Sequence, residues 1–400
     1  MKNTMQKRHI IIGTSAAGLS AAKRLALLAP HDEIICISDE AVLPYNKCHL
    51  ASYLAGEKEE YDVLTVQQAE LDTKGIIFKL GMRVLSIDTE NQEVTCDDGS
   101  ALRYDTLFIG TGSSPKMPPI LNIRDCSGVL TFHSLQDTQH LLQLKTEKKL
   151  HEVVIIGAGL SGLECADALN TQGIKVHAIE LRDRVLCHQV NARGAALIQA
   201  RMEACGVQFY PNQQVTQVLN EQGIVRGVQL ADGRSIEADA VIIAAGLKPN
   251  TELLVTTPIE LHHGHVMVNE YMQTSVPHVY AGGDACMILD QITGERTPSR
   301  TWSDAMLQGM TAAFNMAGSS RIYPGAAVIT SSAFFGLKFA TCGFVVDVPE
   351  GSRCIESSTE NSYELCVVQN GILKGFLLVG DTAKLSQYRR FVLTKEPFPG

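Results

Sequence analysis

Two stretches of the chain have the same pattern of apolar and polar residues. The first stretch reads as a strand, a glycine-containing turn, an amphipathic helix and a second strand, in residues 9–12, 13–18, 19–28 and 33–37. The second stretch comprises residues 152–156, 157–162, 163–171 and 175–179, and its glycine turn begins 144 residues after the first. Each order predicts a βαβ unit, so the chain contains two copies of one supersecondary structure. The wide separation indicates two nucleotide sites and not a solenoid.

Shorter patterns fill the rest of the chain. Residues 93–96, followed by Asp97-Asp98-Gly99, and residues 228–236, around Asp232-Gly233, predict hairpins. Prolines 115, 118 and 119 indicate a linker after the first unit. Further elements are predicted as a strand at 279–281, a helix at 303–316, strands at 338–344, 364–369 and 373–379, and a helix at 385–392. The last 75 or so residues therefore predict a small α+β domain.

Composition and charge narrow the class of protein. The 400 residues predict two or three domains, and 45% hydrophobic against 19% charged residues is an ordinary globular balance. The net charge of −9 argues against nucleic acid or an anionic membrane as the main partner. No apolar run approaches the roughly 20 residues of a membrane helix. We expect a soluble cytoplasmic protein.

The sulfur and imidazole groups predict no metal centre. The 11 cysteines are scattered and contain no C-x-x-C pair, which favours reduced thiols. His262, His263 and His265 cluster beside a glycine, but no cysteine or carboxylate completes a ligand set. We expect no bound metal.

The second glycine turn has the full pattern of a dinucleotide site. Gly157, Gly159 and Gly162 lie between strand and helix, where backbone N–H groups meet a pyrophosphate. Glu180 ends the next strand, at the position that binds a ribose 2′-hydroxyl.

The first turn is less regular. Gly13 and Gly18 flank Ser15, Ala16 and Ala17, so a serine occupies the middle glycine position. Its small side chain still permits close approach of a phosphate. Two carboxylates, Asp39 and Glu40, follow the second strand, and the sequence leaves open which of them contacts the ribose.

Three later segments carry a resemblance to a family. Residues 104–112, 238–250 and 274–284 read YDTLFIGTG, ADAVIIAAGLKPN and TSVPHVYAGGD. In this order and spacing the chain resembles the FAD- and pyridine-nucleotide-dependent oxidoreductases with two dinucleotide-binding domains. The resemblance implies FAD and NADH as cofactors, with Thr111, Gly112, Gly246 and Gly283 at the cofactors and Asp284 on the ribityl chain of the flavin.

The resemblance also implies the architecture. The expected fold is α/β, with two Rossmann-like dinucleotide-binding domains, the FAD domain discontinuous and the NAD domain inserted, plus a small α+β C-terminal domain. The expected boundaries are residues 1–116 and 247–324 for the FAD domain, 117–246 for the NAD domain and 325–400 for the C-terminal domain.

Other segments are similar to one branch of the family. The C-terminal residues and the segment around Tyr45 to Gly56 resemble rubredoxin reductases and the flavin portion of NADH-dependent nitrite reductase. In these relatives the residue matching Lys47 lies near the flavin and pairs with the one matching Glu164. A cation there stabilises the negative charge of reduced flavin. The resemblance also implies Trp302 beside the nicotinamide side of the flavin; a core role for Trp302 is the alternative.

Cys48 suggests a different route for the electrons. The segment from Cys48 to Gly56 also aligns with the single redox cysteine of NADH peroxidase, NADH oxidase and coenzyme A disulfide reductase. Lys47 next to it favours a thiolate. Against this route, His49 replaces a small residue, Ala16 stands where peroxidases carry a catalytic histidine, and the long dimer domain of those enzymes is missing.

We therefore expect an NADH-dependent flavoprotein oxidoreductase that passes electrons to a small acceptor protein, rubredoxin-like, or to a partner subunit, nitrite-reductase-like. Lys47, Glu164 and Cys48 are the candidate catalytic residues. The first alternative is a thiol or disulfide reductase, peroxidase or oxidase that uses Cys48. The second is a non-catalytic, nucleotide-binding flavoprotein. The sequence leaves monomer and homodimer open.

Overall fold

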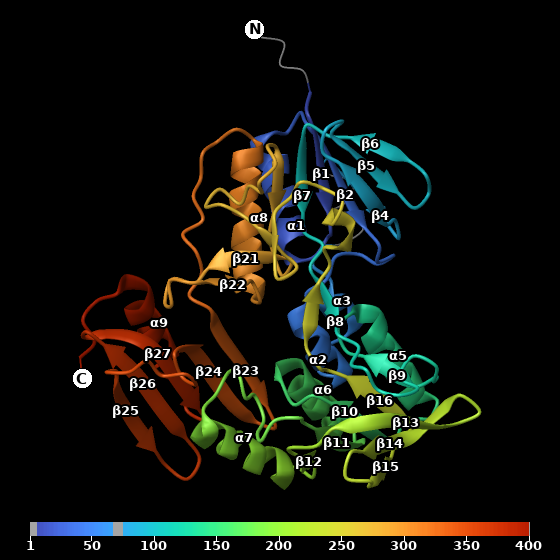
Figure 1. Ribbon diagram of the computed structural model, residues 1–400, viewed down its shortest axis with the longest axis vertical. Coiled ribbons are helices and arrows are strands. Elements are labelled where there is room, and N and C mark those ends of the chain that lie inside the picture. Colours follow the sequence, from blue (N-terminus) through green and yellow to red (C-terminus); the bar gives the residue numbers. More distant parts are fainter. Residues whose placement is uncertain (1–5, 67–74, 400) are drawn as a thin grey trace. The chain divides into compact units, whose positions relative to one another are not determined.

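Two parallel five-stranded sheets organise the chain, and each is built around one predicted βαβ unit (Figure 1). The structure is a computed structural model and describes residues 6–66 and 75–399. The described residues of 1–46, 61–114 and 248–326 form one compact unit, here called the first unit. Those of 47–60, 115–247 and 327–400 form the second unit.

The sheet of the first unit has the order β20-β7-β1-β2-β3. Its strands are β20 (Val279–Ala281), β7 (Thr106–Ile109), β1 (Arg8–Ile12), β2 (Glu33–Ser38) and β3 (Ile76–Leu80). Apolar residues such as Ile10, Ile11 and Phe108 are fully buried in it. All four pairings are parallel, so the carboxyl ends of the strands meet at one edge.

Two helices lie side by side in the first unit, α1 (Ala16–Leu28) and α8 (Trp302–Met316) (Figure 1). They approach so closely that a Cβ on Gly309 would lie 2.0 Å from the carbonyl oxygen of Ala17. The smaller elements of this unit are α3 (Glu60–Val63), β4 (Val84–Asp88), β5 (Glu93–Cys96), β6 (Ala101–Arg103), η2 (Glu252–Leu254), β18 (Leu261–His262), β19 (His265–Met267), β21 (Cys286–Leu289) and β22 (Arg296–Pro298).

The second unit repeats the architecture with the order β12-β11-β10-β16-β9. Its strands are β12 (Gln208–Tyr210), β11 (Lys175–Ile179), β10 (Glu152–Ile156), β16 (Ala240–Ile243) and β9 (Val129–Thr131). Its helices are η1 (Lys47–His49), α2 (Leu50–Leu54), α5 (Leu135–Thr146), α6 (Leu160–Thr171) and α7 (Ala192–Ala204). A three-stranded sheet adds β13 (Val215–Glu221), β14 (Ile224–Leu230) and β15 (Ser235–Glu237), while β8 (Ser113–Pro115) and β17 (Leu247–Pro249) lie where the chain passes from one unit to the other.

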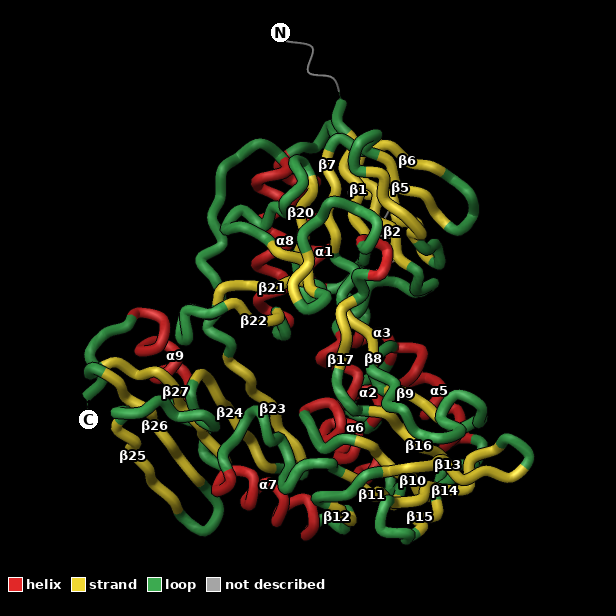
Figure 2. The backbone as a smooth tube through the Cα atoms, viewed as in Figure 1, coloured by secondary structure: helices red, strands yellow, loops and turns green. Residues whose placement is uncertain are grey.

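The C-terminal region is an antiparallel sheet with one final helix, and Figure 2 shows how strongly strands dominate it. Its elements are β23 (Ile329–Phe334), β24 (Leu337–Gly343), β25 (Arg353–Ser358), β26 (Tyr363–Gln369), β27 (Ile372–Val379) and α9 (Leu385–Thr394). Phe334, Phe339 and Val379 of this sheet share one hydrophobic core with Leu163 and Ile198 of α6 and α7. The C-terminal region is therefore continuous with the second Rossmann sheet through side-chain packing.

The predicted elements are largely confirmed. Strands β5, β10, β11 and β20 have the predicted bounds, and the Asp-Gly turns join hairpins. Two helix starts were predicted three residues too late, because α1 begins at Ala16 and α6 at Leu160, inside the glycine turns. Strand β25 was missed because its sequence RCIESS is polar and mostly exposed. The division into three domains, the FAD domain in two segments, with the stated boundaries stays a prediction.

Within residues 6–66 and 75–399, no helix is both long enough and apolar enough to cross a membrane. None of the eleven cysteines forms a disulfide in the described part of the chain.

Candidate dinucleotide sites

In the second unit, the glycine turn closes tightly on the neighbouring strand. Gly157 has a φ of +109° and donates its N–H to the carbonyl oxygen of Ile179 at 2.8 Å. A Cβ on Gly157 would lie 2.4 Å from the oxygen of Ala244, and one on Gly162 would lie 2.0 Å from the oxygen of Gly157. Both positions therefore need glycine, one for its backbone angle and both for space.

Gly159 has a different role in the same turn. It is the N-cap of α6 with extended backbone angles, φ −79° and ψ −171°. Within the described residues, no atom lies within 4 Å of the place where its Cβ would be. The first N–H groups of a 12-residue helix face this space, and a phosphate fits there. The turn thus fits the pyrophosphate of NADH.

Glu180 is fixed at the end of β11 by two backbone groups. Its Oε2 accepts the N–H of Ala158 at 2.8 Å, and its Oε1 accepts the N–H of Arg182 at 2.9 Å. The carboxylate is thereby tied to the glycine turn and is held in place before any ligand binds. This arrangement suits a group that accepts a ribose hydroxyl. Gly246 lies in the same unit, with a φ of +96°.

The first turn has the same geometry despite its serine. Gly13 has a φ of +97° and donates to the oxygen of Ile37 at 2.7 Å. A Cβ on Gly13 would lie 2.1 Å from the oxygen of Gly110, and one on Gly18 would lie 1.9 Å from the oxygen of Gly13. Ser15 is the N-cap of α1 with φ −80° and ψ −162°, nearly the angles of Gly159. The middle position needs no glycine, because any residue adopts these angles.

Ala16 and Ala17 form the first turn of α1 and are buried. The side chain of Ser15 makes no capping hydrogen bond within the described chain. The N–H groups at this end of a 13-residue helix are therefore available to a pyrophosphate, and the turn fits FAD.

The strand register places a serine where the second unit has its ribose carboxylate. Ile37 pairs with Ile12 in the first unit, as Ile179 pairs with Ile156 in the second. The residue that matches Glu180 is therefore Ser38, one position before the predicted Asp39 and two before Glu40.

The two predicted carboxylates are held differently from each other. Asp39 is exposed, with an oxygen 3.8 Å from Nε of Arg83. Glu40 accepts a hydrogen bond from the hydroxyl of Tyr45 at 2.7 Å and donates its N–H to the hydroxyl of Ser38 at 3.2 Å. Their predicted contacts with the FAD ribose stay predictions.

Segments far apart in the sequence converge beside the first turn. Thr111 and Asn250 exchange two hydrogen bonds, at 2.7 and 3.0 Å, and the N–H of Asn250 donates to the oxygen of Gly112 at 3.0 Å. The hydroxyl of Ser113 donates to the carboxylate of Asp284 at 2.9 Å. The structure thus brings together three sequence-predicted residues, and adds Asn250 and Ser113 as their supports.

Gly283 precedes Asp284 with a φ of +78°, and Trp302 is the first residue of α8. Both lie in the first unit with the first glycine turn. The predicted place of Trp302 beside the nicotinamide side of the flavin stays a prediction.

Lys47, Cys48 and Glu164 lie in the second unit. The ammonium of Lys47 lies 3.2 Å from Nε2 of His133, and the carboxylate of Glu164 accepts a hydrogen bond from the hydroxyl of Ser332 at 2.8 Å. Burial raises the pKa of Glu164, although the Ser332 hydroxyl acts in the opposite direction. The pairing of Lys47 with Glu164 stays a prediction.

His133 and Ser332 carry no signal in the sequence that predicts these contacts. His133 is 86 positions from Lys47, and Ser332 is 168 positions from Glu164, and neither belongs to a motif. Cys48 is exposed in the short helix η1, so a thiol-dependent reaction has access to it.

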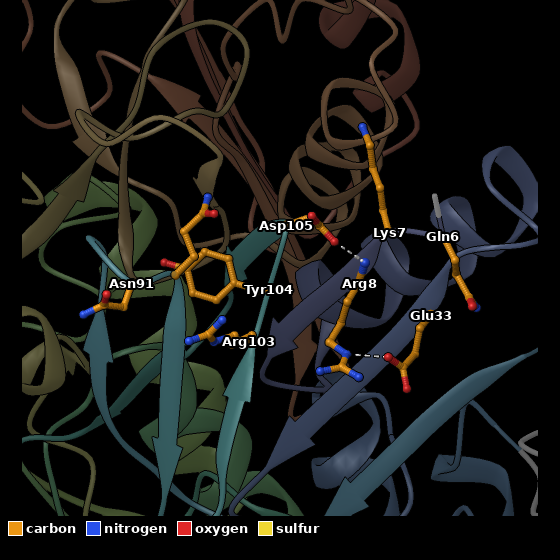
Figure 3. A pocket seen from close by; sticks show the side chains of 9 residues that line it. Gln6, Lys7, Arg8, Glu33, Asn91, Arg103, Tyr104 and Asp105 are labelled. Carbon is orange, nitrogen blue, oxygen red and sulfur yellow. Dashed lines mark hydrogen bonds and ion pairs between the residues drawn. The ribbon is translucent and has the colours of Figure 1, made fainter. Parts of the chain in front are cut away.

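A polar cavity of about 420 Å³ lies at the opposite end of the first sheet (Figure 3). Lys7, Arg8 and Asp105 line it at the amino ends of β1 and β7, whereas Gly13 follows the carboxyl end of β1. It is therefore separate from the glycine turn.

Two glycine turns, each at the carboxyl end of a parallel sheet and each leading into a helix, define a protein that binds two dinucleotides. The pyridine nucleotide-disulphide oxidoreductase family model matches residues 7–309. The chain belongs to this family, which binds FAD and NAD(H), and it is an NADH-dependent flavoprotein oxidoreductase.

The chain is also similar to individual proteins. It is 30% identical over 324 residues to an NADH oxidase of Methanocaldococcus jannaschii, covering 79% of this chain and 72% of that protein. It is 30% identical over 381 residues to the assimilatory nitrate reductase electron transfer subunit of Bacillus subtilis, covering 94% of this chain and 48% of that protein. The chain thus spans about half the length of this second relative.

Among solved structures, the ferredoxin reductase for the CYP199A2 system of Rhodopseudomonas palustris has the same fold, with a TM-score of 0.90. The two chains are 24% identical, and the match covers 98% of this chain and 96% of the other.

Proposed function

We propose that this oxidoreductase passes electrons from NADH to a small electron-carrier protein or a partner subunit, and not to a thiol substrate at Cys48. One observation carries the proposal. The similarity to the electron transfer subunit extends over 94% of the chain, so it includes most of the C-terminal sheet. The similarity to a rubredoxin-NAD(+) reductase of Pseudomonas putida, 30% identical over 79% of this chain, supports the same route. The NADH oxidase matches over an equal share, so the experiment below decides between them.

In this proposal the two cofactors bind at the glycine turns of different units. Glu180 and the turn around Gly159 bind NADH, and the turn around Ser15 binds the pyrophosphate of FAD. Asp284, supported by Ser113, holds the ribityl chain. Bound FAD supplies the ability to accept a hydride and to release electrons one at a time. Lys47 provides a cation that stabilises the reduced form.

The decisive experiment compares the wild type with Cys48→Ser. The variant is expected to keep most of its NADH oxidation with ferricyanide or a small iron–sulfur protein as acceptor, since no thiol chemistry is needed. An anaerobic reductive titration of the wild type is expected to take up about two electrons per FAD, with no long-wavelength charge-transfer band.

A second function is favoured by the exposure of Cys48 and its position next to Lys47. In that case the titration takes up about four electrons, two of them by an oxidised sulfur, and Cys48→Ser is inactive toward peroxide or disulfide. A four-electron titration with a band that disappears in Cys48→Ser would overturn the proposed route.

The proposed compartment is the reducing cytoplasm. Eleven cysteines without a disulfide in the described structure support it.

A further inference from the structure

Gln308 is a fully buried polar residue on α8, with an exposed fraction of 0%. Its Oε1 accepts the N–H of Gly283 at 2.7 Å. Its Nε2 donates to the hydroxyl of Ser299 at 2.9 Å and to that of Tyr323 at 3.4 Å. The amide oxygen and both amide hydrogens therefore have partners, which a buried polar group requires.

The hydrogen bond to Gly283 reaches the turn that carries Asp284. Gly283 has a φ of +78°, and a Cβ there would lie 3.3 Å from Cβ of Ala17 on α1. A Cβ on Gly282 would lie 3.0 Å from the ring of Phe108 and 3.2 Å from Cβ of Gln308. The turn is thus enclosed by two helices and one strand, and Gln308 makes the polar contact that fixes its backbone.

An apolar side chain of similar volume would fill the same space. It would leave the N–H of Gly283 and the hydroxyl of Ser299 without this partner, in a place that is closed to water. Because the amide also joins α8 to Ser299 and Tyr323, it sets the orientation of the turn relative to the helix.

We propose that Gln308 is a positioning residue for Asp284, and through it for the ribityl chain of FAD. The inference rests on the proposed role of Asp284. Gln308 acts by fixing the backbone on which Asp284 stands, so that the carboxylate is already in place when FAD binds. Its effect should therefore appear in the affinity for FAD.

Replacing the amide of Gln308 by a carboxyl group distinguishes a hydrogen-bonding role from packing alone, because only the hydrogen-bonding role makes the affinity for FAD depend on pH. In Gln308→Glu, the protonated carboxyl group keeps one acceptor for Gly283 and one donor for Ser299. The ionised form loses the donor and adds a negative charge near Asp284. The other titratable groups around this site are Cys286, Tyr323 and Asp304, and the pKa of both Cys286 and Tyr323 is raised by burial.

The experiment measures the Kd of FAD for the full-length apoprotein by flavin fluorescence between pH 5.5 and 8.5. Gln308→Met is expected to weaken binding about tenfold at every pH, the effect of about one lost hydrogen bond. Gln308→Glu is expected to bind nearly as the wild type at low pH and about tenfold more weakly at high pH. The wild type should show no such step.

Two outcomes would overturn the proposal: FAD affinity equal to the wild type in both variants, or equal loss at every pH in Gln308→Glu and Gln308→Met. Ser299→Ala keeps the Gly283 contact and removes one partner of Nε2, so it is expected to fold and to give a smaller loss. If the Gln308 variants do not fold, an unchanged Kd of FAD in Ser299→Ala would contradict the proposal.

Two further variants separate this inference from the proposed function. Asp284→Asn tests the role of Asp284 itself; an unchanged Kd there contradicts the part of the proposed function in which Asp284 holds the ribityl chain. A weaker Kd in Asp284→Asn with unchanged Gln308 variants contradicts only the inference. Thr138→Val, at a fully buried threonine of the second unit, is expected to lower stability without changing the affinity for FAD.

Discussion

The two glycine turns of this chain differ in sequence at the position where their geometry is least demanding. Ser15 and Gly159 share extended backbone angles, whereas Gly13 and Gly157 both have positive φ and no room for a side chain. A missing glycine in the middle of the motif is therefore no sign of a weaker site. The outer two glycines are the ones that the backbone requires.

The units differ more at the end of the second strand. The second unit places Glu180 there, held by the N–H groups of Ala158 and Arg182. The first unit places Ser38, a neutral hydroxyl. The same turn geometry is thus combined with different residues at the ends of the two second strands.

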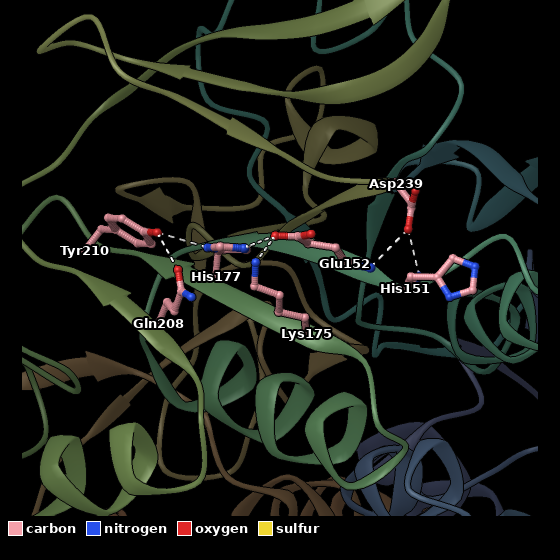
Figure 4. A network of polar contacts seen from close by, with 7 residues as sticks. All are labelled: His151, Glu152, Lys175, His177, Gln208, Tyr210 and Asp239. Atoms are coloured by element: carbon pink, nitrogen blue, oxygen red, sulfur yellow. Dashed lines mark hydrogen bonds and ion pairs between the residues drawn. The ribbon is translucent and has the colours of Figure 1, made fainter.

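The amino-terminal edges of the sheets carry the same ion pair with its charges exchanged. Arg8 of β1 pairs with Glu33 of β2, whereas Glu152 of β10 pairs with Lys175 of β11 at 2.6 Å (Figures 3 and 4). In the second unit Glu152 also bonds the buried His177, at 2.5 Å. In both units the ion pair joins the first residues of two paired strands, and the positive charge can lie on either strand.

The largest expected effect comes from alanine at the third glycine of each turn. Gly18→Ala should abolish FAD binding, and Gly162→Ala should leave a yellow protein that NADH no longer reduces, because each new Cβ would meet a carbonyl oxygen at about 2 Å. Flavin absorbance and stopped-flow reduction measure the two losses separately. Gly159→Ser, which copies the first turn, is the control and should change little.

If both alanine variants lost flavin, or if Gly159→Ser were as damaging as Gly162→Ala, the division of the two sites between the two turns would be wrong.

Nucleotide preference tests the ribose end of the second unit. NADH should be preferred over NADPH, because the carboxylate of Glu180 repels a 2′-phosphate, a cost of about 1–3 kcal/mol. Glu180→Ala should lower kcat/KM for NADH and narrow the preference. Arg182 and Arg184 lie close in sequence, and their positive charges favour a 2′-phosphate. The preference for NADH that remains in Glu180→Ala should therefore be small.

The matched variant in the first unit is Ser38→Ala, whose kcat/KM for NADH should equal that of the wild type. Equal kcat/KM for NADH and NADPH in the wild type would contradict the assignment of Glu180.

Lys47→Met should slow reduction of the flavin by NADH about tenfold, a change of ~1.4 kcal/mol in the barrier, because the reduced form loses a cation. Glu164→Gln should have a smaller effect, since the charge of Lys47 remains. Stopped-flow rates and flavin potentials measure both. Unchanged rates and potentials in Lys47→Met would remove it from the candidate site.

Glu164 also predicts a pH dependence of stability. Burial raises its pKa, so the folded protein holds a proton that the unfolded chain releases, and stability falls as pH rises from the ordinary carboxyl pKa to the raised one. Glu164→Gln has no carboxyl group to titrate here, so it does not lose stability in this way. The difference between its Tm and that of the wild type should therefore rise between pH 4 and 7. The first unit has Ser20 at the matching position and offers Ser20→Ala as a control with a flat difference.

The smallest effect is expected at the exchanged ion pairs. Arg8→Met should lower Tm by less than about 4 °C, as for other partly exposed pairs. Glu152→Gln should lower it more, because the buried His177 loses its carboxylate partner and keeps only the hydroxyl of Tyr210. Lys175 and then His177 lower the pKa of Glu152, so its contribution is present at neutral pH and is lost as pH falls through the lowered pKa. A larger loss for Glu152→Gln at pH 4 than at pH 7 would contradict this.

Most of the fold was predictable because both βαβ units carry their own signals. Apolar runs such as Val153 to Ile155 are buried on both faces, and the turns between strand and helix need glycine. Strand β25 lacked such a signal, since exposed edge strands take polar residues. The sequence also could not place His133, Ser332 or Gln308, because their contacts depend on how distant elements pack.

The order of strands in the first sheet has a consequence for synthesis. Strand β20 pairs with β7, yet residues 115–247 of the second unit separate these strands in the chain. A ribosome must therefore complete the second Rossmann sheet before it releases the last strand of the first. During translation the protein should acquire its fold for NADH before its fold for FAD, and flavin should be incorporated only late, when α8 has emerged.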